Sequence, residues 1–234
     1  MSNRASTWPI HIRHFSQRRM APYLLDCDGN ISGAEKLYSW NVSISSAFWE
    51  VIGHLEVALR NGLAAQMLFI QQRRGRSEEW VFSSDTMILN ANPKMRAHIE
   101  SAIDRVELNA KEVTQEQVIS ELTLGFWCQF VAKHNRAHWP EIAGCFKGLK
   151  SRNQSEISKL LSEVRSMRNR IGHHHRIYNL DIEQRHENLL LLAHCIDPEF
   201  GAWLRSKSRV DEILALRPKP TQSQQNPQPL PPKP

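Results

Sequence analysis

The most constraining feature of the sequence is a run of about thirty residues without proline, from Val42 to about Gln72. Its apolar residues recur at steps of three and four, which places them on one face of an α-helix. They are Ile44, Phe48, Val51, Leu55, Leu59, Leu63, Met67 and Ile70. Gly53 and Gly62 weaken this helix by on the order of 1 kcal/mol each relative to alanine, without ending it. A helix of this length predicts the spine of a helical bundle.

Most of the remaining sequence also has helical periodicity, and it contains neither a convincing strand nor an internal repeat. Capping patterns at Thr114, Ser155 and Asp181 indicate three helix starts. The other predicted helices cover residues 32–40, 93–110, 115–121, a segment ending near 134, 156–171, 182–196 and 199–216. The sequence therefore predicts an all-α fold, with one helical domain over residues 32–216.

The two ends of the chain are predicted to lie outside this domain. Residues 1–31 form an N-terminal extension that contains two prolines and an Asp-Gly-Asn turn. Residues 217–234 are rich in proline, glutamine and asparagine, with too little apolar surface to fold, so we expect a disordered or polyproline-like tail. Its last six residues, PLPPKP, fit either a ligand for a proline-binding domain or a solubilising tail.

Composition and charge narrow the class of protein. The chain is 41% hydrophobic and 23% charged, which is ordinary for a soluble globular protein. It has no uninterrupted apolar run near the roughly 20 residues of a membrane span and no signal-peptide apolar region. A cytoplasmic protein without a membrane partner is therefore expected. The four cysteines lack the spacing of a zinc site and are predicted to be reduced and to act as small apolar residues.

The positive charge is concentrated in one part of the chain. The net charge is +6, and residues 133–176 contain ten Lys or Arg against three Glu. A basic excess of this kind is expected for a surface that binds a polyanion, and also for a merely solvated face. The side chains predicted to contact the backbone of RNA are Lys147, Lys150, Arg152, Arg170, His175 and Arg176.

The segment 167–176, with sequence MRNRIGHHHR, combines the residue types needed to hold a phosphodiester and move its protons. Arginine offers a rigid fork of donors for phosphate, and histidine titrates near neutral pH. The candidate catalytic residues are Arg168, Asn169, His173 and His174. On an ideal helix Arg168 and His173 lie about 140° apart, so we expect Gly172 to end the helix and let His173 turn back.

Residues of the long helix are predicted to support this site. Glu56 and Arg60 are four residues apart, in the order that favours a helical ion pair. Both lie next to the apolar stripe, so we expect one of them to reach inward and contact the 167–176 segment. Asn61 is adjacent and belongs to the same predicted supporting group.

Four blocks occur in an order that resembles Abi-like proteins, the abortive-infection branch of the HEPN superfamily. They are Trp40-Asn41, the 55–61 block LEVALRN, the 122–127 block LTLGFW and the 167–174 block MRNRIGHH. Residues 168–173 are similar to the R-x-x-x-x-H signature of that superfamily. Where many members carry an acidic–proline pair after the two histidines, this chain has His175-Arg176, which makes the site more basic.

The resemblance implies a HEPN-like helical bundle that forms a homodimer, with two motifs facing one cleft. It implies a metal-independent endoribonuclease without a cofactor, in which the ribose 2′-hydroxyl attacks and leaves a 2′,3′-cyclic phosphate and a 5′-hydroxyl. His173 would transfer protons, and Arg168 would stabilise the charged phosphoryl oxygens. The implied setting is phage defence or a toxin–antitoxin system, with an antitoxin protein or a nucleotidyltransferase-type protein as a partner.

Four other readings remain open at the level of sequence. In one, Arg168 and Asn169 only cap and join helices, and the histidines lie in a solvated loop. A non-catalytic RNA-binding or protein-binding helical bundle would keep the same basic face without chemistry. A metal site at His173-His174-His175 is less favoured, because adjacent side chains diverge and no matching carboxylate pair accompanies them. A nucleotide-handling transferase is also less favoured, because the chain has no glycine-rich phosphate loop.

Overall fold

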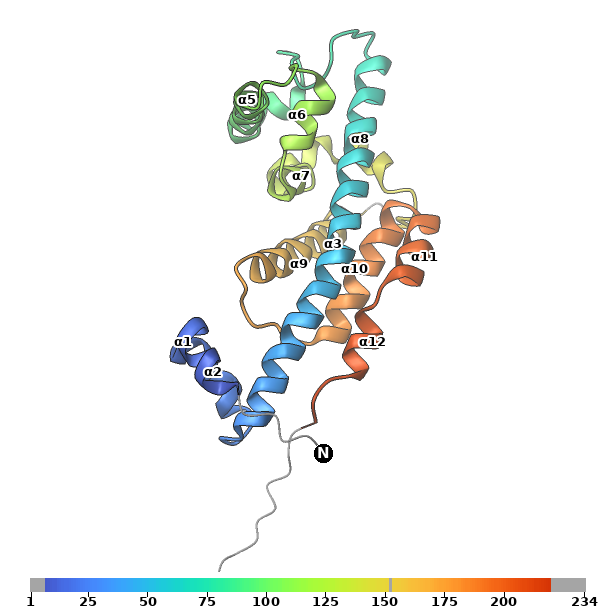
Figure 1. The fold of residues 1–234 in the computed structure, drawn as a ribbon. Helices are drawn as coiled ribbons and strands as arrows, with labels where there is room; N and C mark the ends of the chain where they lie inside the picture. Colours follow the sequence, from blue (N-terminus) through green and yellow to red (C-terminus); the bar gives the residue numbers. More distant parts are fainter. Residues whose placement is uncertain (1–6, 152, 220–234) are drawn as a thin grey trace, which may run out of the picture. The chain divides into compact units, whose positions relative to one another are not determined.

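The computed structural model describes residues 7–151 and 153–219, and every regular element in these two ranges is helical (Figure 1). The predicted all-α fold is therefore confirmed. Arg152 and most of the predicted tail, residues 220–234, lie outside the described residues.

The long helix is α3, a single element of 43 residues from Ile31 to Arg73 (Figure 1). The sequence predicted two pieces here, 32–40 and 42–72, but Asn41 does not interrupt the helix and is itself only 5% exposed. All eight apolar positions of the predicted stripe are 0–8% exposed. At about 1.5 Å per residue, α3 extends roughly 65 Å.

By length and composition, α3 is also apolar enough to cross a membrane, with an 18-residue window of mean hydropathy 1.2. The same test is passed by core helices of soluble proteins, and 39% of this window is buried in the fold. Several of its apolar side chains, such as Phe48, Leu55 and Leu59, are at most 1% exposed, whereas Val57 and Phe69 are about half exposed.

The chain divides into two compact units, and the boundary falls inside α3. The first unit contains residues up to Ser46 and from Val210 onward. Its helices are α1 (Trp8–Phe15), α2 (Gln17–Leu25), the first part of α3, and α12 (Val210–Ala215). The Trp40 Nε1–H donates to the carbonyl oxygen of Ile213 at 2.7 Å, and the Arg217 guanidinium lies 5.2 Å from the Trp40 ring centre. These contacts attach the C-terminal helix to α3.

The second unit, Ala47–Arg209, contains the remainder of α3 and the helices that follow it. They are α4 (Met87–Asn90), α5 (Pro93–Leu108), α6 (Gln115–Glu121), α7 (Leu124–Gln129), η1 (Lys133–His138), α8 (Trp139–Ile142), η2 (Ala143–Cys145), α9 (Gln154–Gly172), α10 (Ile182–Ile196) and α11 (Pro198–Lys207). In this unit α5 packs on α6 and α7, and α10 packs on α9 and α11 (Figure 1).

Capping residues explain several helix boundaries. Thr114 Oγ1 accepts from the Gln117 N–H at 3.3 Å, and Asp181 Oδ1 accepts from the Gln184 N–H at 3.0 Å, so both predicted caps are confirmed. The predicted cap at Ser155 is wrong, because Asn153 Oδ1 accepts from the Ser155 N–H at 3.1 Å and the helix begins two residues earlier than expected.

Two predicted helices are shorter in the structure. The one expected to end near residue 134 stops at Gln129, and a 3-10 helix follows from Lys133 to His138. The one expected over residues 199–216 is divided into α11 and α12, since residues 208 and 209 are not helical. In both places the apolar residues keep helical spacing in the sequence although the chain changes direction. Packing imposes this change of direction, so the spacing does not reveal it.

An aromatic cluster fills the core of the second unit. Trp80, Phe126, Trp127 and Phe130 are all fully buried. Trp127 and Phe130 stack with ring centres 5.7 Å apart, and Phe126 meets Trp127 edge to face at 5.0 Å. The aromatic pair of the 122–127 block is therefore core packing, as the sequence favoured, and not a surface for stacking a nucleobase.

Candidate active site

The candidate site is built on the C-terminal end of α9, which stops in a Schellman motif. The His175 N–H donates to the carbonyl oxygen of Arg170 at 2.7 Å, and the His174 N–H donates to that of Ile171 at 2.8 Å. His174 is the residue with a left-handed backbone, at φ 54°. As expected, Gly172 is the last residue of α9, but it does not supply the left-handed turn, which falls two residues later at His174.

The position of this turn decides where His173 lies. Its N–H donates to the carbonyl oxygen of Asn169 at 3.0 Å, so His173 is the C-cap residue of α9, held over the last helical turn, and does not swing back toward Arg168. Arg168 and His173 are therefore not brought into contact within one copy of the chain. The side chains of Arg168 and His173 are therefore expected to point about 140° apart around the axis of α9, as on an ideal helix.

Replacing His174 with glycine is expected to raise the free energy of unfolding by about 1 kcal/mol, because glycine adopts positive φ without the steric penalty of a Cβ. Urea unfolding followed by circular dichroism measures the change. His175→Gly is the matched control, since His175 does not have a positive φ, and it should bring no gain. Equal stability of His174→Gly and the native chain would contradict this account of the turn.

Arg168 is held by an aromatic residue from a distant part of the chain. Its guanidinium carbon lies 5.5 Å from the centre of the Trp49 ring, the geometry of a cation–π contact. The Trp49 side chain is 44% exposed. A Cβ built on Gly172 would lie 3.7 Å from Arg168 Nη1 and 3.9 Å from the Trp49 ring. Trp49, Arg168 and Gly172 therefore form one continuous surface.

Sequence reasoning missed Trp49. It stands outside the apolar stripe of α3, next to the buried Phe48, at a position where a surface helix normally carries a polar residue. A large aromatic side chain at a predicted solvent-facing position was the available signal. The contact with Arg168 could not be read from the sequence, because it depends on how α3 and α9 pack.

Arg170 has a structural part in the same turn. Its Nη2 donates to the carbonyl oxygen of Arg176 at 2.8 Å, and its own carbonyl oxygen accepts from His175. Arg170 thus ties the second half of the 173–176 loop to α9. The prediction that it contacts RNA stays untested, but this guanidinium is already engaged on the protein side.

The three histidines and Asn169 are open to solvent. The His173 and His175 rings are neighbours, with centres 5.9 Å apart and planes inclined by 35°. His174 lies between them in sequence but has the left-handed backbone. His173 and His175 therefore present two imidazoles on one exposed surface, together with the Asn169 side chain one turn below.

The predicted supporting residues of α3 do not reach this loop. Glu56 Oε1 accepts from the Leu124 N–H at 3.0 Å and so caps the first turn of α7. Arg60 Nε donates to Asn61 Oδ1 at 3.4 Å, and no ion pair joins Arg60 to Glu56 within the described ranges. Glu56 thus contacts the 122–127 block at Leu124, the first residue of α7, because a carboxylate is favoured at a helix N-terminus.

The predicted basic contacts around residue 150 lie at the other end of α9. Lys150 precedes this 19-residue helix and the histidines follow it, which separates them by roughly 28 Å along its axis. Lys147 Nζ pairs with Asp197 at 3.3 Å. A hydrogen bond from the Phe200 N–H and then the Lys147 ammonium lower the pKa of the Asp197 carboxyl. Arg152 lies outside the described residues. Lys147 and Lys150 are not part of one compact site with His173.

The cysteines are not candidates for nucleophilic chemistry. Burial raises the pKa of the Cys128 thiol to about 11 and that of the Cys145 thiol to about 12, which keeps both protonated at neutral pH. All four cysteines are free thiols. Across residues 7–151 and 153–219, no group of three or more His, Cys, Asp and Glu side chains is arranged to hold a metal ion.

Comparison with known proteins gives one family. Residues 28–179, well over half of the chain, match the family described as Abi-like protein. The chain belongs to the Abi-like protein family. The family match includes the 55–61, 122–127 and 167–174 blocks and ends just before α10. Membership points to a role in abortive infection, a form of phage defence. Searches of curated proteins and of solved structures each gave no match.

Proposed function

We propose that this Abi-like protein is a metal-independent endoribonuclease of the HEPN type. The observation that carries the proposal is the end of α9, where the exposed Asn169 and His173 follow the half-buried Arg168 inside the family match. The motif thus joins a donor fork for phosphate to an accessible imidazole. The surrounding residues are basic, which favours RNA as the substrate.

The proposed reaction is an internal transesterification. An imidazole removes the proton of a ribose 2′-hydroxyl, and the resulting oxygen attacks the adjacent phosphorus. The bond from phosphorus to the 5′-oxygen breaks, and an imidazolium protonates that oxygen. The products are a 2′,3′-cyclic phosphate and a 5′-hydroxyl. His173 is the proposed proton-transfer group, and His175, whose ring is adjacent, is a contact to the phosphate backbone.

Arg168 would neutralise the charge that builds on the phosphoryl oxygens during attack. Its contact with Trp49 supports this role, because a guanidinium stacked on a ring loses less conformational freedom when it binds phosphate. Trp49 is in this account a positioning residue. Asn169, four residues before His173 and exposed, is the proposed second phosphate ligand.

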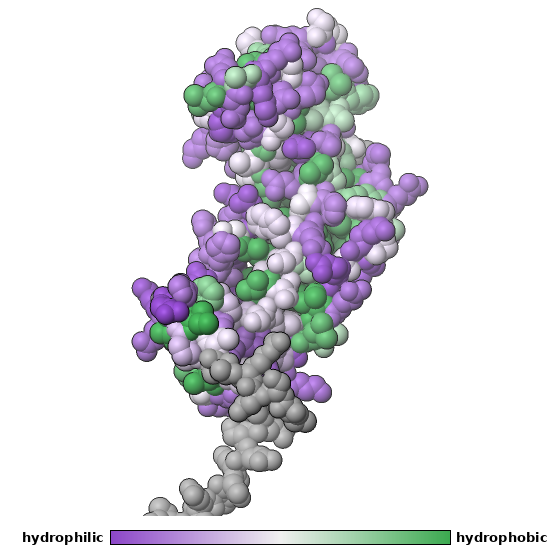
Figure 2. Space-filling model, in the orientation of Figure 1, coloured by the Kyte–Doolittle hydropathy of each residue, from purple (hydrophilic) through white to green (hydrophobic). Residues whose placement is uncertain are grey.

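We further propose that the active unit is a homodimer in the cytoplasm. Catalytic groups on an open surface need a second surface to exclude water and enclose the substrate. Half-exposed apolar side chains lie on α3, among them Trp49 at the site, 44% exposed, and Val57 about two turns further along the helix, 46% exposed. In Figure 2, apolar and intermediate residues interrupt the hydrophilic surface over α3. A second copy would cover them and bring two motifs together. An antitoxin or nucleotidyltransferase-type partner would then regulate this dimer.

The test is cleavage of a labelled, mixed-sequence RNA by the native protein in excess EDTA. We expect cleavage to persist, with 2′,3′-cyclic phosphate and 5′-hydroxyl ends identified by mass spectrometry. A DNA strand of the same sequence should remain intact, because it has no 2′-hydroxyl. Loss of cleavage in EDTA would point to metal-dependent chemistry. Salt-sensitive RNA binding without cleavage would instead establish a non-catalytic binding module.

A further inference from the structure

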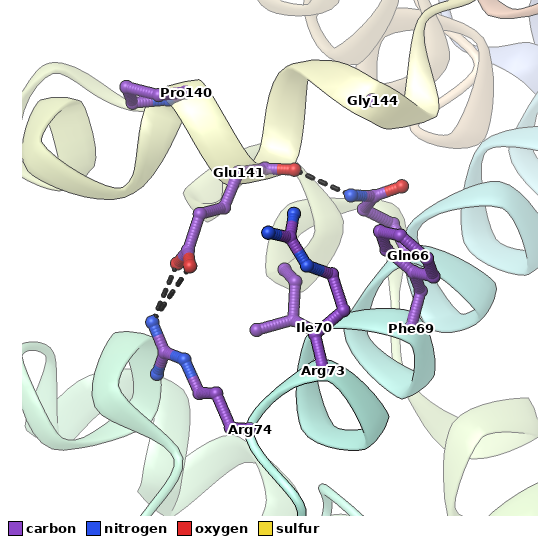
Figure 3. Close-up of a pocket in the computed structure, with 8 residues that line it drawn as sticks. All are labelled: Gln66, Phe69, Ile70, Arg73, Arg74, Pro140, Glu141 and Gly144. Atoms are coloured by element: carbon purple, nitrogen blue, oxygen red, sulfur yellow. Dashed lines mark hydrogen bonds and ion pairs between the residues drawn. The ribbon is translucent and has the colours of Figure 1, made fainter.

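A separate pocket lies at the C-terminal end of α3, where it meets the α8–η2 segment (Figure 3). Its volume is about 380 Å³, within the range of small-molecule sites. The residues that line it come from two segments, Gln66 to Arg74 and Pro140 to Gly144. It contains no residue of the proposed active site, and Arg73 is separated from Trp49 by roughly 36 Å along α3.

The pocket is held in shape by contacts between its two segments. Gln66 Nε2 donates to the carbonyl oxygen of Glu141 at 2.6 Å, and Arg74 Nη2 donates to both carboxylate oxygens of Glu141, at 2.8 and 2.9 Å. A Cβ on Gly144 would lie 2.8 Å from the Gln66 amide atoms, so glycine leaves the room that this side chain occupies. These contacts fix the walls and neutralise the only carboxylate that lines the described pocket.

Among the residues that line the pocket, Arg73 carries a charge that these contacts do not neutralise. Figure 3 shows its guanidinium pointing into the space between Glu141 and Gln66. In the described part of the chain the Arg73 guanidinium contacts the Phe69 ring, with 5.8 Å from the guanidinium carbon to the ring centre. The lining therefore carries a net charge of about +1, centred on Arg73, with five N–H donors directed to the cavity and solvent.

Helix capping does not explain Arg73. The last carbonyl groups of α3 are satisfied by backbone donors, since the Arg76 N–H binds the Gln71 oxygen at 3.1 Å and the Gly75 N–H binds the Gln72 oxygen at 3.0 Å. Gly75 has the left-handed φ of 67° that this Schellman motif requires. The Arg73 side chain is thus available for a ligand.

The other wall is apolar. Phe69 is 50% exposed beside the guanidinium, and Ile70 and Pro140 also line the cavity. A half-exposed aromatic ring next to an arginine favours a planar ring that stacks, combined with an anionic group for the fork.

We propose that this pocket binds a phosphate monoester joined to a nucleobase, with the phosphate on Arg73 and the base against Phe69. Two sources share this chemistry: a free mononucleotide and the phosphorylated end of a nucleic-acid strand. Either occupant would make the α3–α8 pocket a ligand site distinct from the RNA-cleaving surface.

Binding of AMP to the full-length protein is measured by isothermal titration calorimetry. AMP should bind at least about tenfold more tightly than adenosine, because the charged fork contacts only the phosphate. Arg73→Ala should weaken AMP binding by about tenfold or more. Arg18→Ala, which removes an equal charge from an exposed position on α2, should leave the affinity for AMP unchanged.

A second variant is expected to strengthen the binding of AMP. Glu141→Gln removes the carboxylate that holds Arg74, so a second guanidinium becomes free for phosphate and AMP should bind several-fold more tightly. The pair is partly exposed, so its loss should leave the fold intact. Circular dichroism of both variants checks this.

The proposal is overturned if AMP does not bind, if adenosine binds as well as AMP, or if Arg73→Ala and Arg18→Ala have equal effects. The two sources are separated with a short DNA strand carrying a 5′-phosphate or a 5′-hydroxyl. Competition with AMP by the phosphorylated strand alone identifies a strand end, and no competition by either strand identifies a free nucleotide. RNA cleavage takes no part in these measurements, so they stand whatever the outcome at His173.

Discussion

Replacement of His173 by alanine is expected to lower the rate of RNA cleavage by about 10²–10⁴-fold, the usual contribution of a positioned acid or base. The variant should keep its fold, because His173 is exposed and its backbone N–H, which caps α9, is retained. Single-turnover cleavage of a labelled RNA measures the rate, and urea unfolding confirms the stability. Binding of RNA should change far less than cleavage.

The neighbouring histidine provides the matched control. His175 lies on the same surface with its ring centre 5.9 Å from that of His173, so His175→Ala removes the same type of side chain from the same place. We expect it to reduce cleavage by less than about tenfold, as a backbone contact would. If His173→Ala cleaves at the native rate, or if His175→Ala is the more damaging change, the assignment of His173 is wrong.

Replacement of Arg168 by alanine is expected to lower cleavage by about 10²–10³-fold, the effect of losing one preorganised group that stabilises transition-state charge. The structure also predicts which copy of the chain provides each of the two residues. Arg168 contacts Trp49 and not His173 within one copy, so we predict that arginine and histidine act on the same phosphate across a dimer.

Mixing the two inactive variants tests this arrangement. In a two-fold dimer with one Arg168→Ala copy and one His173→Ala copy, one site regains an arginine from one copy and a histidine from the other. Random exchange should therefore restore about a quarter of the native activity. A mixture that remains inactive would show that the two residues act within one copy, while still leaving each single-variant result in place.

Local signals in the sequence located much of the fold. The periodic apolar residues of α3, from Ile44 to Ile70, are buried as expected, and the caps at Thr114 and Asp181 work as predicted. These features depend on interactions within one or two helical turns, which the sequence displays directly. The candidate motif at 168–173 was found in the same way, as a dense local group of functional side chains.

Local signals in the sequence indicated the wrong residue where two residues close together could both take the same structural role. Gly172 was the better residue for a left-handed turn, yet His174 takes that conformation at φ 54°. The Arg170 contacts with His175 and Arg176 fix the turn in this register, and they outweigh a backbone preference of about 1 kcal/mol. Likewise Ser155 and Asn153 both suit a helix start, and the helix uses Asn153.

The sequence by itself determined the all-α class, the long helix and the residues able to handle a phosphodiester. Only the tertiary structure decided which of those residues meet. Trp49 packs on Arg168, Glu56 caps α7, and Arg74 pairs with Glu141, leaving Arg73 facing a cavity. Each of these contacts joins side chains from separate helices. Their partners are fixed by how whole helices pack, a property that periodicity and capping along one segment do not encode.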